Sequence, residues 1–135
     1  MRLFIYCSDP REKADLETKI CQKLLVPGEK IMRLANCGYP IVLSHPIAFP
    51  HEANTLLRQI NFMIREFHPE QIVFPGHDCG WYEESVLTTG TILFEKKRDI
   101  LRIHKMLLRR YPSQVFKSFF DVTQGEKVQF EPIAA

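Results

Sequence analysis

The sequence predicts an α/β domain in which a mostly parallel sheet lies between helices. Short apolar runs alternate along the chain with segments of helical periodicity, which is the pattern of strand–helix–strand units. The runs at residues 3–6 and 71–74 are apolar at almost every position, which is typical of strands buried on both faces. A length of 135 residues fits one domain that spans residues 1–135.

The strands are assigned from apolar runs bounded by turn residues. The run at residues 41–43 lies between Pro40 and Pro46, so it is expected to be short or irregular. Gly125 separates the last two runs, which are expected to form a strand or hairpin at the sheet edge. The expected strands are residues 3–6, 31–34, 41–43, 71–74, 115–122 and 127–130.

Three segments carry apolar residues at helical spacing, namely residues 13–25, 52–67 and about 91–110. The second is the clearest, and His68-Pro69 ends it. Its apolar positions are Ala53, Leu56, Leu57, Ile60, Met63, Ile64 and Phe67. On the neighbouring helices we expect Cys21 and His104 to pack in the core, and the basic stretch from Lys96 to Arg98 to be solvated.

Composition and charge exclude several classes of protein. The net charge is +2, from 18 basic and 16 acidic residues, and no basic cluster is interleaved with aromatics, so no nucleic-acid partner is expected. The longest uncharged run, residues 34–50, contains three prolines and is not expected to span a membrane. The first apolar run is too short for a signal peptide. We therefore expect a soluble cytoplasmic protein whose four cysteines are free thiols or metal ligands.

Residues with metal-binding chemistry follow two of the expected strands. Cys7 comes directly after the first strand, and His77 and Cys79 come after the strand at 71–74. In open α/β sheets, ligand sites lie beyond the carboxyl ends of the strands. Two sulfurs and one imidazole nitrogen suit Zn²⁺ and leave the fourth tetrahedral position for water or another ligand. The sequence therefore predicts a zinc site formed by Cys7, His77 and Cys79.

A carboxylate and a guanidinium accompany the first of these cysteines. Asp9 and Arg11 follow Cys7 at alternate positions. A carboxylate can accept a hydrogen bond from a metal-bound water, and a guanidinium can hold that carboxylate ionised and in place. Asp9 and Arg11 are therefore the candidate catalytic residues. A surface ion pair or a turn before Pro10 is the alternative interpretation.

These residues resemble the β-class carbonic anhydrases, and the likeness runs in the same order over most of the chain. Cys7-Ser8-Asp9-Pro10-Arg11 has that family's Cys-x-Asp-x-Arg pattern. The strand that leads into Gly76-His77, with Cys79-Gly80, is similar to its second zinc-ligand loop. Weaker similarities lie at residues 28–38, which resemble a strand with an Arg-Asn-Ala-Gly turn, and at the tail, residues 119–125.

The resemblance implies a parallel sheet of order 2-1-3-4 with an edge strand or hairpin. It also implies zinc-dependent hydration of CO₂ to bicarbonate, with a small-molecule substrate and a homodimer or higher homo-oligomer. By position, Cys7, His77 and Cys79 would be the zinc ligands. Asp9 and Arg11 would orient the zinc-bound hydroxide, or Asp9 would itself close onto the metal as a fourth ligand.

The ligand loop departs from the family pattern, which leaves other functions open. The family has His-x-x-Cys, whereas this chain has His77-Asp78-Cys79, one residue shorter. Cys37 is a possible substitute for Cys79. One alternative is a catalytically inactive zinc-binding or interaction module that retains the fold. Hydrolysis of a CO₂-like molecule such as carbonyl sulfide would use the same residues. Thiol chemistry at Cys7 lacks the usual Cys-x-x-Cys pair.

Overall fold

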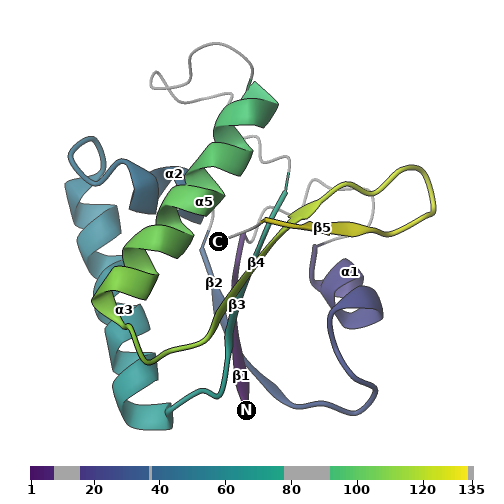
Figure 1. Ribbon diagram of the computed structural model, residues 1–135, viewed down its shortest axis with the longest axis horizontal. Helices are drawn as coiled ribbons and strands as arrows, with labels where there is room; N and C mark the ends of the chain where they lie inside the picture. The colour runs from purple at the N-terminus through teal and green to yellow at the C-terminus, as the bar shows by residue number, and fades with distance from the viewer. Residues whose placement is uncertain (8–15, 37, 78–91, 134–135) are drawn as a thin grey trace.

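A five-stranded sheet forms the centre of the molecule (Figure 1). The computed structural model describes residues 1–7, 16–36, 38–77 and 92–133. The strands run in the order β2-β1-β3-β4-β5, and only β5 is antiparallel to its neighbour. This confirms the expected mostly parallel sheet, its order 2-1-3-4 and the added edge strand. The strands are β1 (Arg2–Tyr6), β2 (Ile31–Ala35), β3 (Ile72–Gly76), β4 (Phe116–Asp121) and β5 (Phe130–Pro132).

Helices cover both faces of the sheet, with one described helix on one side and three on the other (Figure 1). On the first face the one described helix is α1 (Leu16–Lys23). The other face carries α2 (Tyr39–Ser44), α3 (Pro50–Phe67) and α5 (Ile92–Arg110). None of the described helices is long and apolar enough to cross a membrane.

The two cores follow from the alternation of side chains along the central strands. Leu3 and Ile5 of β1 pack toward α2, α3 and α5. Phe4 and Tyr6 of the same strand pack toward Leu16 of α1. Successive residues of a strand point to opposite faces, so a strand between two helical layers is apolar at every position. This is why the continuous apolar runs correctly predicted the central strands.

The expected strand at residues 41–43 is wrong, because these residues lie in α2. Residues Tyr39, Pro40, Ile41, Val42 and Leu43 are all buried. A short run that is buried on every side has no polar face, so its periodicity does not separate a strand from a helix. Pro40 lies in the first helical turn, where its fixed φ and missing N–H are tolerated.

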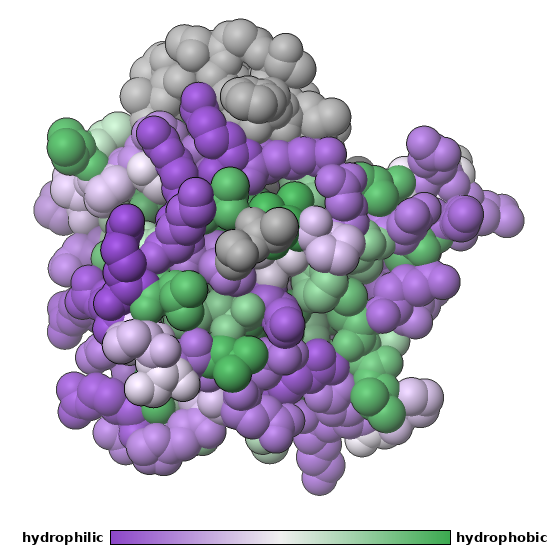
Figure 2. All heavy atoms as spheres, in the orientation of Figure 1, coloured by the Kyte–Doolittle hydropathy of each residue, from purple (hydrophilic) through white to green (hydrophobic). Residues whose placement is uncertain are grey.

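Two side-chain expectations on the helices are also wrong. Cys21 of α1 is exposed rather than in the core. Lys96 of α5 is buried, although the neighbouring Arg98 is exposed as expected. Figure 2 shows hydrophilic side chains over much of α5, and Arg98, Arg102 and Lys105 are among its exposed residues.

His104 is packed in the core, as its position on the helix predicts. It lies beside the rings of Phe74 and Phe116, at centroid separations of 5.5 and 6.3 Å. Ser118 donates from Oγ to the carbonyl of Ile133, so the same oxygen accepts the Nδ1–H of His104 at 3.0 Å. Burial, followed by the charge of Lys117, lowers the pKa of His104 from 6.5. The fold therefore holds this imidazole neutral.

The fold is expected to lose stability in mild acid because of His104. Since its pKa is lower in the folded state, the unfolded chain takes up this proton first as the pH falls below 6.5. The free energy of unfolding should therefore fall between pH 6.5 and the lower folded pKa. Urea unfolding of the wild type and His104→Gln, from about pH 8 to about pH 5, measures this. The variant should lose most of the dependence in this window, whereas the exposed His51→Gln should retain it.

Candidate metal centre

The structure places Cys7 and His77 at the carboxyl ends of two neighbouring strands. Cys7 follows β1, His77 follows β3, and their exposed fractions are 1% and 3%. Leu3 is in register with Ile72, so extending that offset sets Cys7 beside Gly76, the residue before His77. Neighbouring strands lie about 4.8 Å apart. The two residues therefore lie at the carboxyl ends of adjacent parallel strands.

The turn that begins α2 contacts both of these strands. Gly38 donates its backbone N–H to the sulfur of Cys7 at 3.4 Å. The hydroxyl of the fully buried Tyr39 donates to the carbonyl of Pro75 at 2.9 Å. Gly38 has a φ of 70°, a left-handed conformation that favours glycine. An N–H directed at a sulfur stabilises the thiolate, which is the form that binds metal.

Close packing fixes the backbone just before His77. A Cβ on Gly76 would lie 2.7 Å from Cδ1 and 2.9 Å from Cγ1 of Ile100, which is fully buried on α5. Glycine therefore permits the close approach between β3 and α5 at this position. The imidazole of His77 is carried by a strand end that α5 holds in place.

Hydrogen bonds join α1 to the carboxyl end of β1. Glu17 accepts hydrogen bonds from the Tyr6 hydroxyl at 2.8 Å and from Nε of Arg33 at 2.6 Å. Burial, and next the bond to Glu17, raise the pKa of Tyr6 to about 12. Because Tyr6 precedes Cys7, these contacts fix the end of β1 on the α1 face.

A buried ion pair links α1 to the end of β4. Lys19 contacts Asp121 at 2.7 Å, and their side chains are 9% and 4% exposed. Thr123 also bonds Asp121 through its backbone N–H and its hydroxyl. Burial raises the pKa of Asp121, but the bonds from Lys19 and Thr123 outweigh it, so the net pKa is lowered. Asp121 directly follows Phe120, the register partner of Gly76, so this pair lies beside the His77 strand end.

The remaining predicted site residues lie outside the described part of the chain. Asp9, Arg11 and Cys79 belong to residues 8–15 and 78–91, and the possible substitute Cys37 is likewise outside it. Within the described residues, no three His, Cys, Asp or Glu side chains form a group that could hold a metal ion. Cys7 and His77 supply one sulfur and one imidazole at the same edge, which are donors that zinc prefers. These two residues fit a zinc site.

Sequence reasoning missed the residues that support the two strand ends. Tyr39, Lys19 and Asp121 have no local motif, because their contacts join segments far apart in the chain. Gly76 had a signal, since a glycine that interrupts an apolar strand suggests close backbone approach. That signal does not reveal which residue packs against it.

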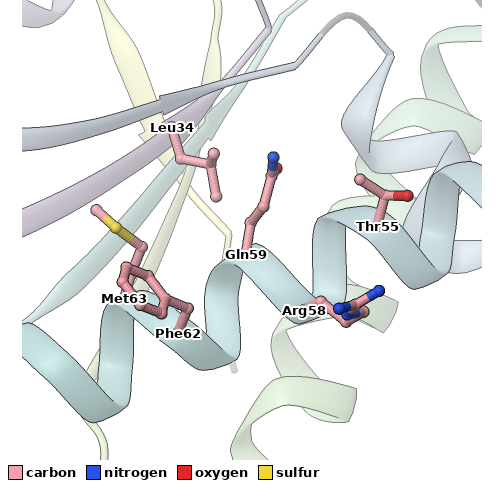
Figure 3. A pocket seen from close by; sticks show the side chains of 6 residues that line it. All are labelled: Leu34, Thr55, Arg58, Gln59, Phe62 and Met63. Carbon is pink, nitrogen blue, oxygen red and sulfur yellow. The ribbon is translucent and has the colours of Figure 1, made fainter.

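A separate groove of about 440 Å³ lies at the outer edge of the sheet (Figure 3). Leu34 of β2 faces side chains of α3 across it. Among the α3 residues, Phe62 is 56% exposed. The residues that line the groove are Leu34, Thr55, Arg58, Gln59, Phe62 and Met63.

Comparison with solved structures identifies a protein of similar fold. The chain resembles the crystal structure of the β-carbonic anhydrase CafA of the fungal pathogen Aspergillus fumigatus, with a TM-score of 0.61 and 15% sequence identity. The match covers 99% of this chain and 76% of that chain. No protein-family model matches the sequence, and no curated protein matches it. The comparison therefore establishes the fold: the chain has an α/β architecture like that of a β-carbonic anhydrase, with a mostly parallel five-stranded sheet flanked by helices.

Proposed function

We propose that the protein binds one zinc ion and hydrates CO₂ to bicarbonate. The observation that carries the proposal is the burial of Cys7 and His77 at the carboxyl ends of adjacent parallel strands, in a carbonic-anhydrase-like fold. Sulfur and imidazole at this edge match the ligands that zinc takes in proteins.

Each predicted site residue has a distinct task in this proposal. Cys7, His77 and Cys79 would hold the ion, which when bound acidifies a water molecule so that it attacks CO₂ at neutral pH. Asp9 would accept a hydrogen bond from that water and so direct a lone pair at the substrate carbon. Arg11 would keep the Asp9 carboxylate ionised and oriented. Gly38 would stabilise the Cys7 thiolate through its N–H.

Stopped-flow measurement of CO₂ hydration tests the proposal on zinc-loaded protein. The wild type should accelerate hydration above the buffer rate, and Asp9→Ala should lose at least about 100-fold in kcat while retaining zinc. Glu126→Ala, which removes an exposed carboxylate between β4 and β5, is the control and should leave the rate unchanged. A zinc-loaded wild type with no rate above buffer would exclude catalysis.

The second candidate is an inactive zinc-binding module with the same fold. The spacing His77-Asp78-Cys79 favours it, because two ligands only two residues apart restrict how the loop can surround the ion. The enzyme needs one zinc position open to water, whereas a purely structural site is closed by four protein ligands. The same stopped-flow experiment separates the two, since a module would bind zinc without turnover.

We also propose that the protein forms a homodimer through the β2 edge. Among the described strands, β2 pairs only with β1, so its other side presents backbone donors and acceptors to a partner strand. The apolar groove beside it continues that edge onto α3 and exposes Phe62 (Figure 3). A second copy, related by a two-fold axis at this edge, would pair its own β2 with the exposed β2 and would cover the groove.

Replacing Phe62 with glutamate should convert the dimer to a monomer. Phe62 is 56% exposed, so the change should leave the free energy of unfolding of the monomer within about 0.5 kcal/mol of the wild-type value. Val115→Glu is the matched control, since Val115 is 48% exposed and does not line the groove. Sedimentation equilibrium should show a dimer for the wild type and the control. A monomeric wild type would contradict the proposal.

A further inference from the structure

The backbone pairing between β1 and β3 ends just before the proposed zinc ligands Cys7 and His77. β1 and β3 are in register over only two pairs, which involve Leu3 and Phe4 of β1. By contrast, β1 stays paired with β2 as far as Tyr6, and β3 stays paired with β4 as far as Gly76. Both strand ends lie within the described residues. The backbone hydrogen-bonded ladder between β1 and β3 therefore ends before Cys7 and His77.

Pro75 explains why the ladder stops. Leu3 donates its N–H to the carbonyl of Gln71 at 2.9 Å, which shows that alternate residues of β1 and β3 direct their backbone groups at each other. When this alternation is continued, the N–H of Ile5 faces the carbonyl of Val73, and the carbonyl of Ile5 faces the nitrogen of Pro75. Proline has no N–H to donate, so this rung of the ladder cannot form.

The turn that begins α2 contacts both strand ends. The carbonyl of Pro75 on β3 accepts the buried hydroxyl of Tyr39 at 2.9 Å. The adjacent Gly38 donates its backbone N–H to the Cys7 sulfur, which follows β1, at 3.4 Å. One turn thus holds a backbone group two residues before His77 and the sulfur of Cys7.

We propose that Tyr39 is a positioning residue for the zinc site, because its turn fixes the ends of β1 and β3 relative to each other. The inference rests on the proposed zinc binding by Cys7 and His77. A zinc ion holds sulfur at about 2.3 Å and imidazole nitrogen at about 2.0 Å, so the ligand strands need a defined separation. Pro75 removes one backbone hydrogen bond between the two strands, so the turn rather than the ladder sets the relative position of their ends. Loss of the Tyr39 hydroxyl releases the β3 end from this turn and misplaces His77 relative to Cys7.

The test compares Tyr39→Phe with Tyr111→Phe. Both changes remove one phenolic hydroxyl and keep the ring. The hydroxyl of Tyr111 bonds Asn61 at 3.0 Å, and that contact joins α3 to the end of α5, away from both ligand strands. Zinc affinity is measured by competition with a chromophoric chelator. The cobalt(II) form is then examined for its thiolate-to-metal absorption band, which reports ligand geometry rather than stability or turnover.

Tyr39→Phe should bind zinc about 10–100-fold more weakly than the wild type and shift or weaken the cobalt band. Tyr111→Phe should match the wild type in both measurements. Pro75→Ala is a second variant that keeps Tyr39 and restores the missing N–H. It should also lower zinc affinity, and its amide at position 75 should become protected from hydrogen exchange in the metal-free protein.

The possible failures are distinguishable. If the wild type binds zinc and Tyr39→Phe and Pro75→Ala bind it equally well with an unchanged cobalt band, the positioning role is wrong and the zinc site stands. If Tyr39→Phe does not fold, Pro75→Ala decides by the same two measurements. A wild type that binds no zinc overturns both the proposed function and this inference. A wild type that binds zinc without hydrating CO₂ overturns the catalytic proposal alone.

Discussion

Replacing His77 with alanine should remove zinc from the protein and abolish CO₂ hydration. The imidazole is the nitrogen donor of the proposed site, and a protein left with only two of its three ligands holds the ion far more weakly. Elemental analysis should show about one zinc per chain in the wild type and almost none in the variant. The rate of CO₂ hydration should fall to that of the buffer.

Two matched controls separate ligation from burial. His104→Gln changes a histidine that is also buried, with 5% exposure, but lies among Phe74 and Phe116. It should retain zinc. For the sulfur ligand, Cys7→Ser should lose zinc, whereas Cys21→Ser should not, since Cys21 is exposed on α1. Full zinc content in both His77→Ala and Cys7→Ser would refute the proposed ligand pair.

Replacing Gly76 with alanine should destabilise the fold by about 1–3 kcal/mol. The added Cβ would lie 2.7 Å from Cδ1 of Ile100, and Ile100 is fully buried, so β3 or α5 must move. Since His77 is the next residue, the movement should also weaken zinc binding. Urea unfolding measures the first effect, and zinc competition measures the second.

A double-mutant cycle identifies the cause of that loss. Ile100→Ala removes both atoms that approach the new Cβ, so Gly76→Ala with Ile100→Ala should cost less than the sum of the single changes. The matched control is Ile103→Ala, because Ile103 is equally buried on α5 but is not among the atoms nearest Gly76. Its cycle with Gly76→Ala should be additive. Equal coupling in the two cycles would exclude the close contact as the cause.

Much of the sheet could be predicted from the sequence, because a strand that is buried on both faces is apolar at almost every position. The runs at 3–6 and 71–74 became β1 and β3, and the position of Cys7 and His77 after them followed from the rule for parallel sheets. The order of the strands came from the family resemblance, and the structure confirms it. α2 was mistaken for a strand because a buried run of a few apolar residues lacks a polar face.

The supports of the site could not be predicted in the same way. The contact between Tyr39 and Pro75, like that between Lys19 and Asp121, joins segments that the chain brings together only on folding. Local sequence pattern predicts whether a segment is a helix or a strand, but it does not predict which distant segment will contact it. Lys96 shows the same limit, since helical periodicity assigns it to a basic stretch while the fold buries it.

X-ray absorption at the zinc edge on the zinc-loaded protein tests the central claim most directly. The account predicts one ion per chain with two sulfurs at about 2.3 Å and nitrogen or oxygen neighbours at about 2.0 Å. Cys7→Ser should reduce the sulfur count to one. An ion surrounded only by nitrogen and oxygen, or a protein that takes up no zinc, would contradict it.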